Sequence, residues 1–333
     1  MGDVSSQAQD PTSATRPRRP PGRRRLVGSL GYQPETALCL LAQHAQSGRR
    51  SLANMTDRRL RRHRLASGPF FIVEDIVCVG GTPHWTPVTM DVGFAVILLR
   101  AGGFRRDAEG RQSFVDPGGG YLSRHGVEER FAYPLDEVDV CTLIGLTAEA
   151  FAEHVDGVAR QQGWHLRTSS SFDLRHRELV AACRRGVDRF EASERVLLLL
   201  SELPARTDRD AISDQRAATR AEHRRLVEAV QEALAGGHLT ADLDELARLA
   251  GSSPHHLSRV FRRLTGRTIT AYRNELRVRA VLEDLAQGAA DVASLAAVYG
   301  FADHAHLTRT VRRHVSDPPV VLRRKLSMNL QAS

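Results

Sequence analysis

The chain has 333 residues, of which 41% are hydrophobic and 26% are charged, which is ordinary for a soluble globular protein of about two domains. Phe94–Leu99 is one of its longest apolar runs, and it is far shorter than the roughly 20 residues of a membrane-spanning helix. This composition excludes a transmembrane protein, a collagen-like fibre and a small disulfide-stapled domain.

The formal net charge of +8 is distributed unevenly along the chain. Residues 1–54 carry a net charge of +5, residues 55–220 carry −1 and residues 221–333 carry +4. A basic terminal domain suits an anionic partner such as nucleic acid, and a solvated basic surface is the alternative. Charge by itself leaves both interpretations open.

Residues 1–54 are predicted to be a disordered basic N-terminal extension, because a polar segment rich in proline and arginine buries too little apolar surface to fold. It shows no apolar segment typical of a secretory signal. The four cysteines, Cys39, Cys78, Cys141 and Cys183, form no CxxC pair. We therefore expect reduced thiols in a cytoplasmic protein rather than a zinc ribbon.

Residues 55–203 are predicted to begin with a β-rich domain. Phe70–Val79 and Phe94–Leu99 have the composition of strands, and the second run is typical of a strand buried on both faces. A hairpin with its turn at Asp107–Gly110 and a last strand over Val138–Ile144 follow. Several short strands separated by glycine-rich turns favour a small barrel or sandwich.

Two helical stretches follow, over residues 147–165 and 172–203. An apolar helical face in the second comprises Leu179, Val180, Cys183, Val187 and Phe190. Helices in this position can pack on the barrel or form the interface of a homodimer, and the sequence leaves both open. The polar residues 204–220 are the predicted linker to a helical C-terminal domain over residues 221–326.

Two segments of that C-terminal domain repeat each other. They cover residues 242–264 and 291–314, and they match in register at an offset of 50 residues from Leu257 and Leu307 onward. The matched arginines are Arg259 and Arg309, Arg262 and Arg312, and Arg263 and Arg313. A helix predicted over Thr270–Ala286 spans ~25 Å and separates the copies by about one turn of DNA, ~34 Å.

Each copy has the features of a helix-turn-helix motif. The first helix is followed by Gly251 or Gly300, and glycine supplies the left-handed conformation at which helices end. Ser253 can then cap the second helix of the first copy, with Pro254 at the first helical position, and Asp303 can cap the second helix of the other copy. The C-terminal domain is therefore predicted to be an all-α double helix-turn-helix.

The outer face of each second helix carries the candidate DNA-binding residues. Arginine can bind O6 and N7 of guanine in the major groove, and arginines nearer the rim suit phosphates. The predicted base-reading residues are His255, Ser258, Arg259, His304, His306 and Arg309. The predicted phosphate-binding residues are Arg262, Arg263, Arg273, Arg277, Arg312 and Arg313. The histidines could instead bind zinc, and the arginines could instead be ordinary surface charges; these are the alternative interpretations.

The C-terminal domain resembles the AraC/XylS family of bacterial transcription activators. The resemblance extends from Asp242 to Arg324 and includes the pattern Gly300-Phe301 followed by His306-Leu307-Thr308-Arg309. It implies an effector-responsive activator that is not an enzyme, with double-stranded DNA and RNA polymerase as partners, and hence a nucleoid-associated protein. The residues that it places at base-reading positions are His255, Ser258, Arg259, His306 and Arg309.

Many members of that family carry an N-terminal cupin-like sensor barrel, which residues 70–146 resemble and which implies a small-molecule effector. The expected fold class is therefore α+β, with a cupin-like β-barrel and following helices before the helix-turn-helix domain. The alternative function is a cupin-type enzyme fused to a DNA-binding module.

A cupin enzyme requires a metal site, which by the same resemblance consists of His-x-His, a Glu and a later His. Such ligands suit iron and other first-row metals. In this chain His84 and His125 are isolated, and Glu128 and Glu129 have no histidine at ligand spacing. A DNA-repair function by alkyl transfer would need an activated cysteine motif, and the cysteines are scattered. We therefore expect no metal, no cofactor and no catalytic residues.

Overall fold

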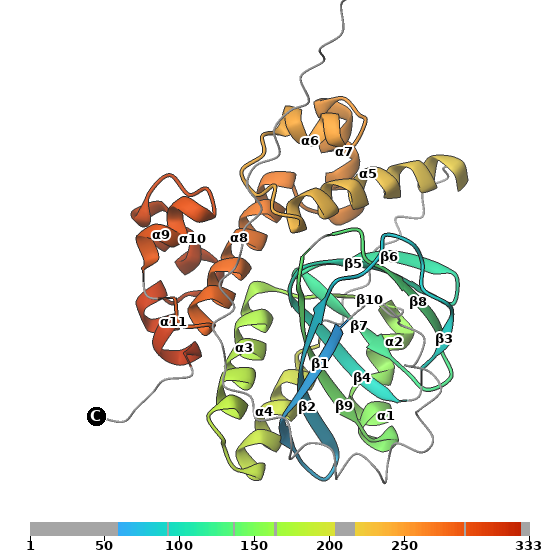
Figure 1. Cartoon of the computed structure of the whole chain (residues 1–333), viewed down its shortest axis with the longest axis vertical. Coiled ribbons are helices and arrows are strands. Elements are labelled where there is room, and N and C mark those ends of the chain that lie inside the picture. The colour runs from blue at the N-terminus through green and yellow to red at the C-terminus, as the bar shows by residue number, and fades with distance from the viewer. Residues whose placement is uncertain are drawn as a thin grey trace, which may run out of the picture. The chain divides into compact units, whose positions relative to one another are not determined.

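A computed structural model describes residues 59–91, 93–135, 137–162, 165–203, 217–289 and 291–327. These described residues belong to one compact unit (Figure 1). The predicted disordered extension, residues 1–54, lies outside the described residues, as do residues 204–216 of the predicted linker. In the described chain, strands β1 to β9 precede the first helix and only the short strand β10 lies among the helices, which confirms the α+β fold class.

The strands of the described residues form two antiparallel sheets. The six-stranded sheet has the order β1 (Arg59–Ser67), β2 (Phe71–Val79), β9 (Asp139–Leu146), β4 (Phe94–Ala101), β7 (Gly119–Ser123) and β10 (His165–Arg167). The four-stranded sheet has the order β3 (Thr89–Met90), β8 (Glu128–Ala132), β5 (Phe104–Ala108) and β6 (Arg111–Val115). Strands β5 and β6 form the predicted hairpin around residues 107–110.

The six-stranded sheet is covered on both faces. Its inner face packs against the four-stranded sheet, so that Leu99 of β4 shares a core with Phe104 of β5. Its other face packs against helices, so that Leu98 shares a second core with Phe151 and Leu179. Because successive strand residues point to opposite faces, residues 94–99 of β4 are apolar on both faces, as the sequence predicted.

Helices follow β9 as predicted, but both predicted helical stretches are interrupted, and the last residue of the first stretch, His165, begins strand β10. The helices of this part are α1 (Ala148–His154), α2 (Asp156–Gln162), α3 (Ser170–Arg184) and α4 (Arg189–Ser201). Gly186 adopts a φ of 78°, and the carboxylate of Asp188 caps α4 by accepting hydrogen bonds from the backbone of Phe190 and Glu191. The predicted apolar face is therefore wrong at its end: Phe190 lies on α4 and is 81% exposed.

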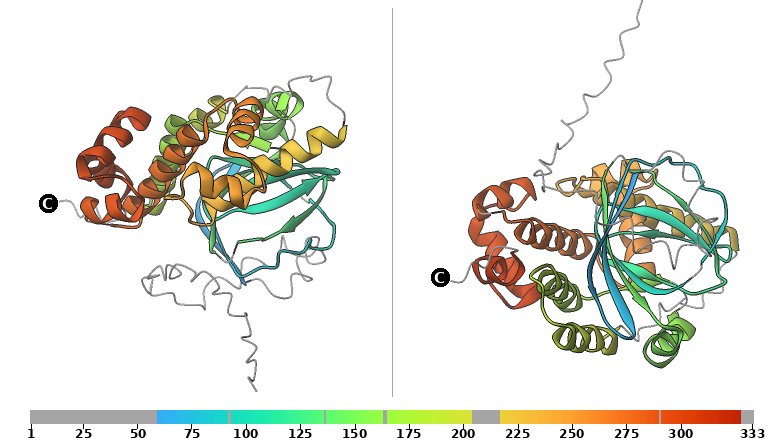
Figure 2. Two further views of the ribbon diagram at one scale, coloured as in Figure 1. Left: turned by 90° about the horizontal axis from the view of Figure 1, so that it is seen from above. Right: turned by 60° about the horizontal axis from the view of Figure 1, so that its bottom comes forward.

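The C-terminal helices, coloured from yellow to red in Figure 2, share one hydrophobic core. They are α5 (Ala217–Ala235), α6 (Leu243–Leu249), α7 (Pro254–Thr265), α8 (Ile269–Ala286), α9 (Val292–Val298), α10 (His304–Val315) and α11 (Pro319–Leu326). Helix α8 runs through this core, where Tyr272 meets the ring of Phe261 edge-on with centroids 5.4 Å apart. No helix of the described residues is long and apolar enough to cross a membrane.

The two-faced burial of β4 can be tested with adjacent substitutions. Leu98→Ala and Leu99→Ala should each reduce the free energy of unfolding by about 2–5 kcal/mol, because each leaves a cavity in a different core. Leu60→Ala on the edge strand β1, where the side chain is 37% exposed, should cost about 0.5 kcal/mol or less. Urea denaturation of the three variants measures these values. A small effect of either β4 substitution would contradict the packing of both faces.

Candidate nucleic-acid interface

Two helix-turn-helix motifs are present, α6–α7 and α9–α10. The side chain of Ser253 accepts a hydrogen bond from the backbone of His256 at 3.3 Å and caps α7. Asp303 accepts from the backbone of His306 at 2.6 Å and caps α10. Both predicted caps are therefore confirmed, and they fix where each second helix begins.

The glycines that end the first helices differ in their surroundings. Gly251 and Gly300 both adopt left-handed backbone conformations, with φ of 66° and 69°. A Cβ atom added at Gly251 would meet open space. A Cβ atom at Gly300 would lie 2.6 Å from a methyl carbon of Thr240 and 3.0 Å from the guanidinium of Arg277. The second turn is therefore closely packed, whereas the first is not.

In the first motif, helix α7 presents the predicted residues to solvent. Leu257, Val260 and Phe261 are buried on its inner side. His255 and Arg259 are exposed on the other side, and Ser258 is partly exposed. The predicted phosphate-binding residues Arg262 and Arg263 are exposed in the last turn of the helix. The helix therefore offers a polar and basic outer face of the kind that enters a major groove.

The second motif repeats this arrangement on helix α10. His304, Arg309, Arg312 and Arg313 are exposed, while Leu307 and Val311 are buried. The arginines that match at an offset of 50 residues are thus exposed in both copies.

His306 takes part in the turn as well as in the outer face. Its Nδ1 accepts a hydrogen bond from the backbone N–H of Ala302 at 3.2 Å, and its ring meets the ring of Phe301 edge-on at 5.5 Å. A ring nitrogen that accepts a hydrogen bond carries no proton, so the neutral ring is protonated at Nε2. His306 can therefore offer Nε2–H as a donor while it holds the turn.

Two arginines expected at phosphates have a different role in this structure. Nε and Nη2 of Arg277 both donate to the carbonyl oxygen of Leu239, at 3.0 and 2.5 Å. Its side chain is buried, and this desolvation lowers its pKa to about 10. Arg273 likewise donates to the carbonyl oxygen of Ala241 at 2.5 Å. Both guanidinium groups thus hold α8 against the connection between α5 and α6. Helical spacing could not reveal these partners, because they lie more than 30 residues away.

The histidines of the motifs do not gather into a metal site. His256 packs against His223 of α5, with ring centroids 5.6 Å apart. Within the described ranges, no three residues among His, Cys, Asp and Glu are arranged to hold a metal ion. The rival zinc interpretation of these histidines therefore gains no support from their positions.

A second polar cluster, which the sequence did not reveal, lies between the two sheets. Arg106 donates to a carboxylate oxygen of Glu129 at 2.9 Å, and its guanidinium lies over the ring of Tyr121 at 4.3 Å. Burial raises the pKa of Glu129 to about 7 although Arg106 opposes the shift, and burial also raises the pKa of Tyr121. His165, opposite Tyr121 on β10, has a buried Nδ1 without a hydrogen-bond partner among the described residues. Burial lowers the pKa of His165 to about 3.

Comparisons with known proteins match the C-terminal part of the chain. The protein family described as "Helix-turn-helix domain" matches residues 246–325. The HTH-type transcriptional regulator GlxA of Rhizobium meliloti (strain 1021) is 36% identical over 84 residues, which are 25% of this chain and 26% of GlxA. The probable transcription factor PqrA of Proteus vulgaris is 28% identical over 86 residues, which are 26% of this chain and 70% of PqrA.

Among solved structures, the DNA-binding domain of AdpA in complex with a target DNA is 29% identical. That match covers 30% of this chain and 90% of the AdpA domain, with a TM-score of 0.28. By the family match and the similarity to GlxA and PqrA, residues 246–325 are a DNA-binding domain of the helix-turn-helix class. Within that class the domain is of the AraC type, as the sequence resemblance predicted, and GlxA and PqrA are described as a transcriptional regulator and a probable transcription factor.

The two turns provide a matched pair of substitutions. Gly251→Ala should cost roughly 1–2 kcal/mol of unfolding free energy, because alanine is strained at positive φ. Gly300→Ala should cost about 1–3 kcal/mol more, because its Cβ atom would also crowd Thr240 and Arg277. Chemical denaturation of both variants checks this order, and equal costs would contradict the packing of the second turn.

The protonation of Glu129 predicts a pH dependence of stability. Its pKa rises from the ordinary 4.5 to about 7 on folding, so the folded state binds more protons between these values. Stability should therefore fall as the pH rises from about 4.5 to 7. Glu129→Gln removes this contribution. Between pH 5 and pH 8 the melting temperature of the wild type should fall relative to that of the variant, and parallel pH profiles would contradict the assignment.

Proposed function

We propose that the protein is a sequence-specific transcription regulator that reads two successive major grooves of double-stranded DNA. The observation that carries this proposal is the matched outer faces of α7 and α10, which expose Arg259 and Arg309 at equivalent positions. Recognition helices of this kind read base edges with side chains near their N-terminal ends.

In this proposal the arginines divide into two groups. Arg259 and Arg309 bind base edges, together with the polar side chains His255, Ser258, His304 and His306. Arg262, Arg263, Arg312 and Arg313 bind phosphates, which gives affinity that falls with salt. Arg273 and Arg277 are left out of the second group, since both donate to backbone carbonyls.

We further propose a small-molecule effector that binds between the sheets, near the Arg106–Glu129 ion pair. Buried polar groups around partly exposed aromatic rings are typical of ligand sites, and Tyr121, Phe131 and Tyr133 supply such rings. The effector is tested by screening for compounds that raise the melting temperature of the wild type but not that of Arg106→Gln. If every compound acts equally on both proteins, the site is not where we place it.

On the family resemblance we also propose that the protein activates transcription, contacts RNA polymerase and has a cytoplasmic, nucleoid-associated location. The placement of the helices after the sheets is the basis on which we propose a homodimer.

The experiment that tests the DNA-binding function is a selection of genomic DNA fragments by the purified protein at near-physiological salt. The expected result is one shared motif of two blocks about 10 base pairs apart, which is one helical turn. Recovery of fragments without a shared motif, both by the full chain and by residues 217–333 alone, would overturn the proposal.

Arg309→Ala and Arg312→Ala should have different effects on DNA binding. Arg309→Ala should lose about 1–3 kcal/mol of discrimination at one base pair, because it removes a base contact. Arg312→Ala should weaken binding to all sequences and reduce the slope of log affinity against log salt by about 1, because it removes a phosphate contact. Binding curves with single-base variants of the selected site at several salt concentrations measure both effects. A uniform loss in Arg309→Ala would contradict its assignment to a base.

A further inference from the structure

Helix α8 carries a polar stripe on the side that faces the N-terminal part of the chain. Tyr272, Glu275, Arg279 and Glu283 are spaced by three or four residues, so they lie along one side of the helix. All four are buried. In a helix-turn-helix domain by itself this stripe would face water, so its burial depends on the rest of the chain.

The first part of the stripe meets the turn between β6 and β7. The hydroxyl of Tyr272 donates to the carboxylate of Asp116, and Arg167 of β10 donates to the Tyr272 oxygen at 3.4 Å. Asp116 also accepts from the backbone of Gly118 at 2.7 Å. The N-terminal end of α8 is thereby tied to the edge of the sheet.

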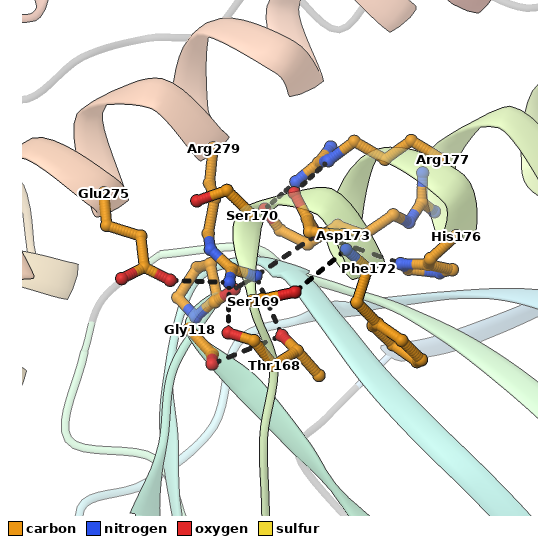
Figure 3. A network of polar contacts seen from close by, with 12 residues as sticks. Gly118, Thr168, Ser169, Ser170, Phe172, Asp173, His176, Arg177, Glu275 and Arg279 are labelled. Atoms are coloured by element: carbon orange, nitrogen blue, oxygen red, sulfur yellow. Dashed lines mark hydrogen bonds and ion pairs between the residues drawn. The ribbon is translucent and has the colours of Figure 1, made fainter. Parts of the chain in front are cut away.

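The middle of the stripe is centred on Arg279, which reaches from α8 between the strands and α3 (Figure 3). Its Nη1 donates to the carbonyl oxygen of Pro117 at 2.7 Å and to the hydroxyl of Thr168 at 3.0 Å. Its Nη2 donates to the carbonyl oxygen of Thr168 and to Glu275, both at 2.7 Å. Asp173 of α3 lies 3.4 Å from Nη1. One buried side chain of the DNA-binding domain thus contacts two separate segments of the N-terminal part.

The last part of the stripe inserts a carboxylate between two arginines. Glu283 accepts from Arg100 of β4 at 3.4 Å and from Arg177 of α3. The Arg177 side chain also donates to Asp173 at 2.9 Å, and Arg100 pairs with Asp75. The two arginines hold the pKa of Glu283 down at about 2, against the effect of its burial.

This clamp, defined as the contacts of Tyr272, Arg279 and Glu283 with the N-terminal part, is polar throughout. Buried ion pairs contribute little net stability compared with apolar contacts. They are nevertheless specific in geometry, because each buried charge must lie within bonding distance of its opposite charge. The clamp therefore fixes one position of α8 rather than adding much to stability.

Helices α5 and α10 each have a further contact of their own with the N-terminal part. Glu232 of α5 accepts from Arg105 of β5 at 2.6 Å. His314 of α10 and Ser170 of α3 share a hydrogen bond of 3.2 Å. The outer-face residues Arg259 and Arg309 nevertheless remain exposed, so the N-terminal part holds the motifs without covering these side chains.

We propose that the clamp holds the two recognition helices at the separation and orientation that match one spacing of the two DNA blocks. This inference rests on the proposed function. The N-terminal part is then a splint for α8, and a change in β4 or α3 reaches both motifs through Arg100, Arg177 and Asp173. The protein then binds both DNA blocks more tightly, because the two motifs already have the right relative position before they meet the DNA and lose less conformational freedom on binding.

The proposal is tested by measuring how much the protein prefers the selected site over sites whose blocks are one or two base pairs further apart. Each added base pair rotates the second block by about 35°. The wild type should bind the lengthened sites about 10-fold to 100-fold more weakly, since the base contacts of one motif are lost. In Glu283→Gln this preference should fall by about 5-fold or more, because the clamp no longer fixes α8.

Two further variants make the result unambiguous. The double variant Arg177→Gln with Glu283→Gln removes one charge of each sign. Arg100 keeps its partner Asp75 and Asp173 keeps its partner Arg279, so no buried charge is left unpaired and the variant should still fold. Glu191→Gln is the matched control, because it removes an ion pair with Arg195, 2.7 Å long, within α4 alone. Melting curves confirm that each variant is folded.

The outcomes separate the two proposals. A reduced spacing preference in both clamp variants, with the control unchanged, supports the splint. An unchanged spacing preference in the clamp variants overturns the splint. This holds if their DNA affinity equals that of the wild type, and also if it is higher at every spacing, which would mean that the clamp inhibits DNA binding. A wild type that binds DNA without any block preference overturns the proposed function and the splint with it.

Discussion

The burial of helix α8 on both sides is the constraint on which the rest of the structure depends. Its apolar residues, such as Val281 and Leu282, form the core that the two helix-turn-helix motifs share. Its polar stripe is buried at the same time against β4, α3 and the β6–β7 turn. Because a buried charge without a partner is costly, every charged group of the stripe requires a partner, and Arg279 and Glu283 have theirs in distant segments. The N-terminal part therefore supplies groups such as Arg100 and Asp173 in defined positions.

The two buried clusters of this protein show how the number of partners decides the state of a carboxylate. Glu129, between the sheets, faces one arginine, and burial outweighs that attraction, so its pKa rises to about 7. Glu283, in the clamp, faces Arg100 and Arg177, and their combined attraction outweighs burial, so its pKa falls to about 2. The first carboxyl group can change its protonation near neutral pH. The second stays charged, which suits a contact that fixes geometry.

Sequence reasoning was most successful where the signal is local. The caps Ser253 and Asp303 and the glycine turns were all predicted, since each depends on residues within one turn of a helix. It was less successful for short strands of mixed polarity: β8, with the sequence EERFA, offers neither a continuous apolar run nor a clear alternation. The break between α3 and α4 was missed for a different reason, because the apolar periodicity continues across Gly186.

The sequence by itself determined the double helix-turn-helix, its α+β context and the outer faces of the two recognition helices. These follow from periodicity, capping and an internal repeat, which are properties of neighbouring residues. Only the tertiary structure decided that Arg273 and Arg277 bind backbone carbonyls and that Glu275, Arg279 and Glu283 are buried. Helical spacing shows which side chains share a side of α8. What covers that side depends on segments more than 100 residues away, such as β4 and α3, and no local pattern specifies them.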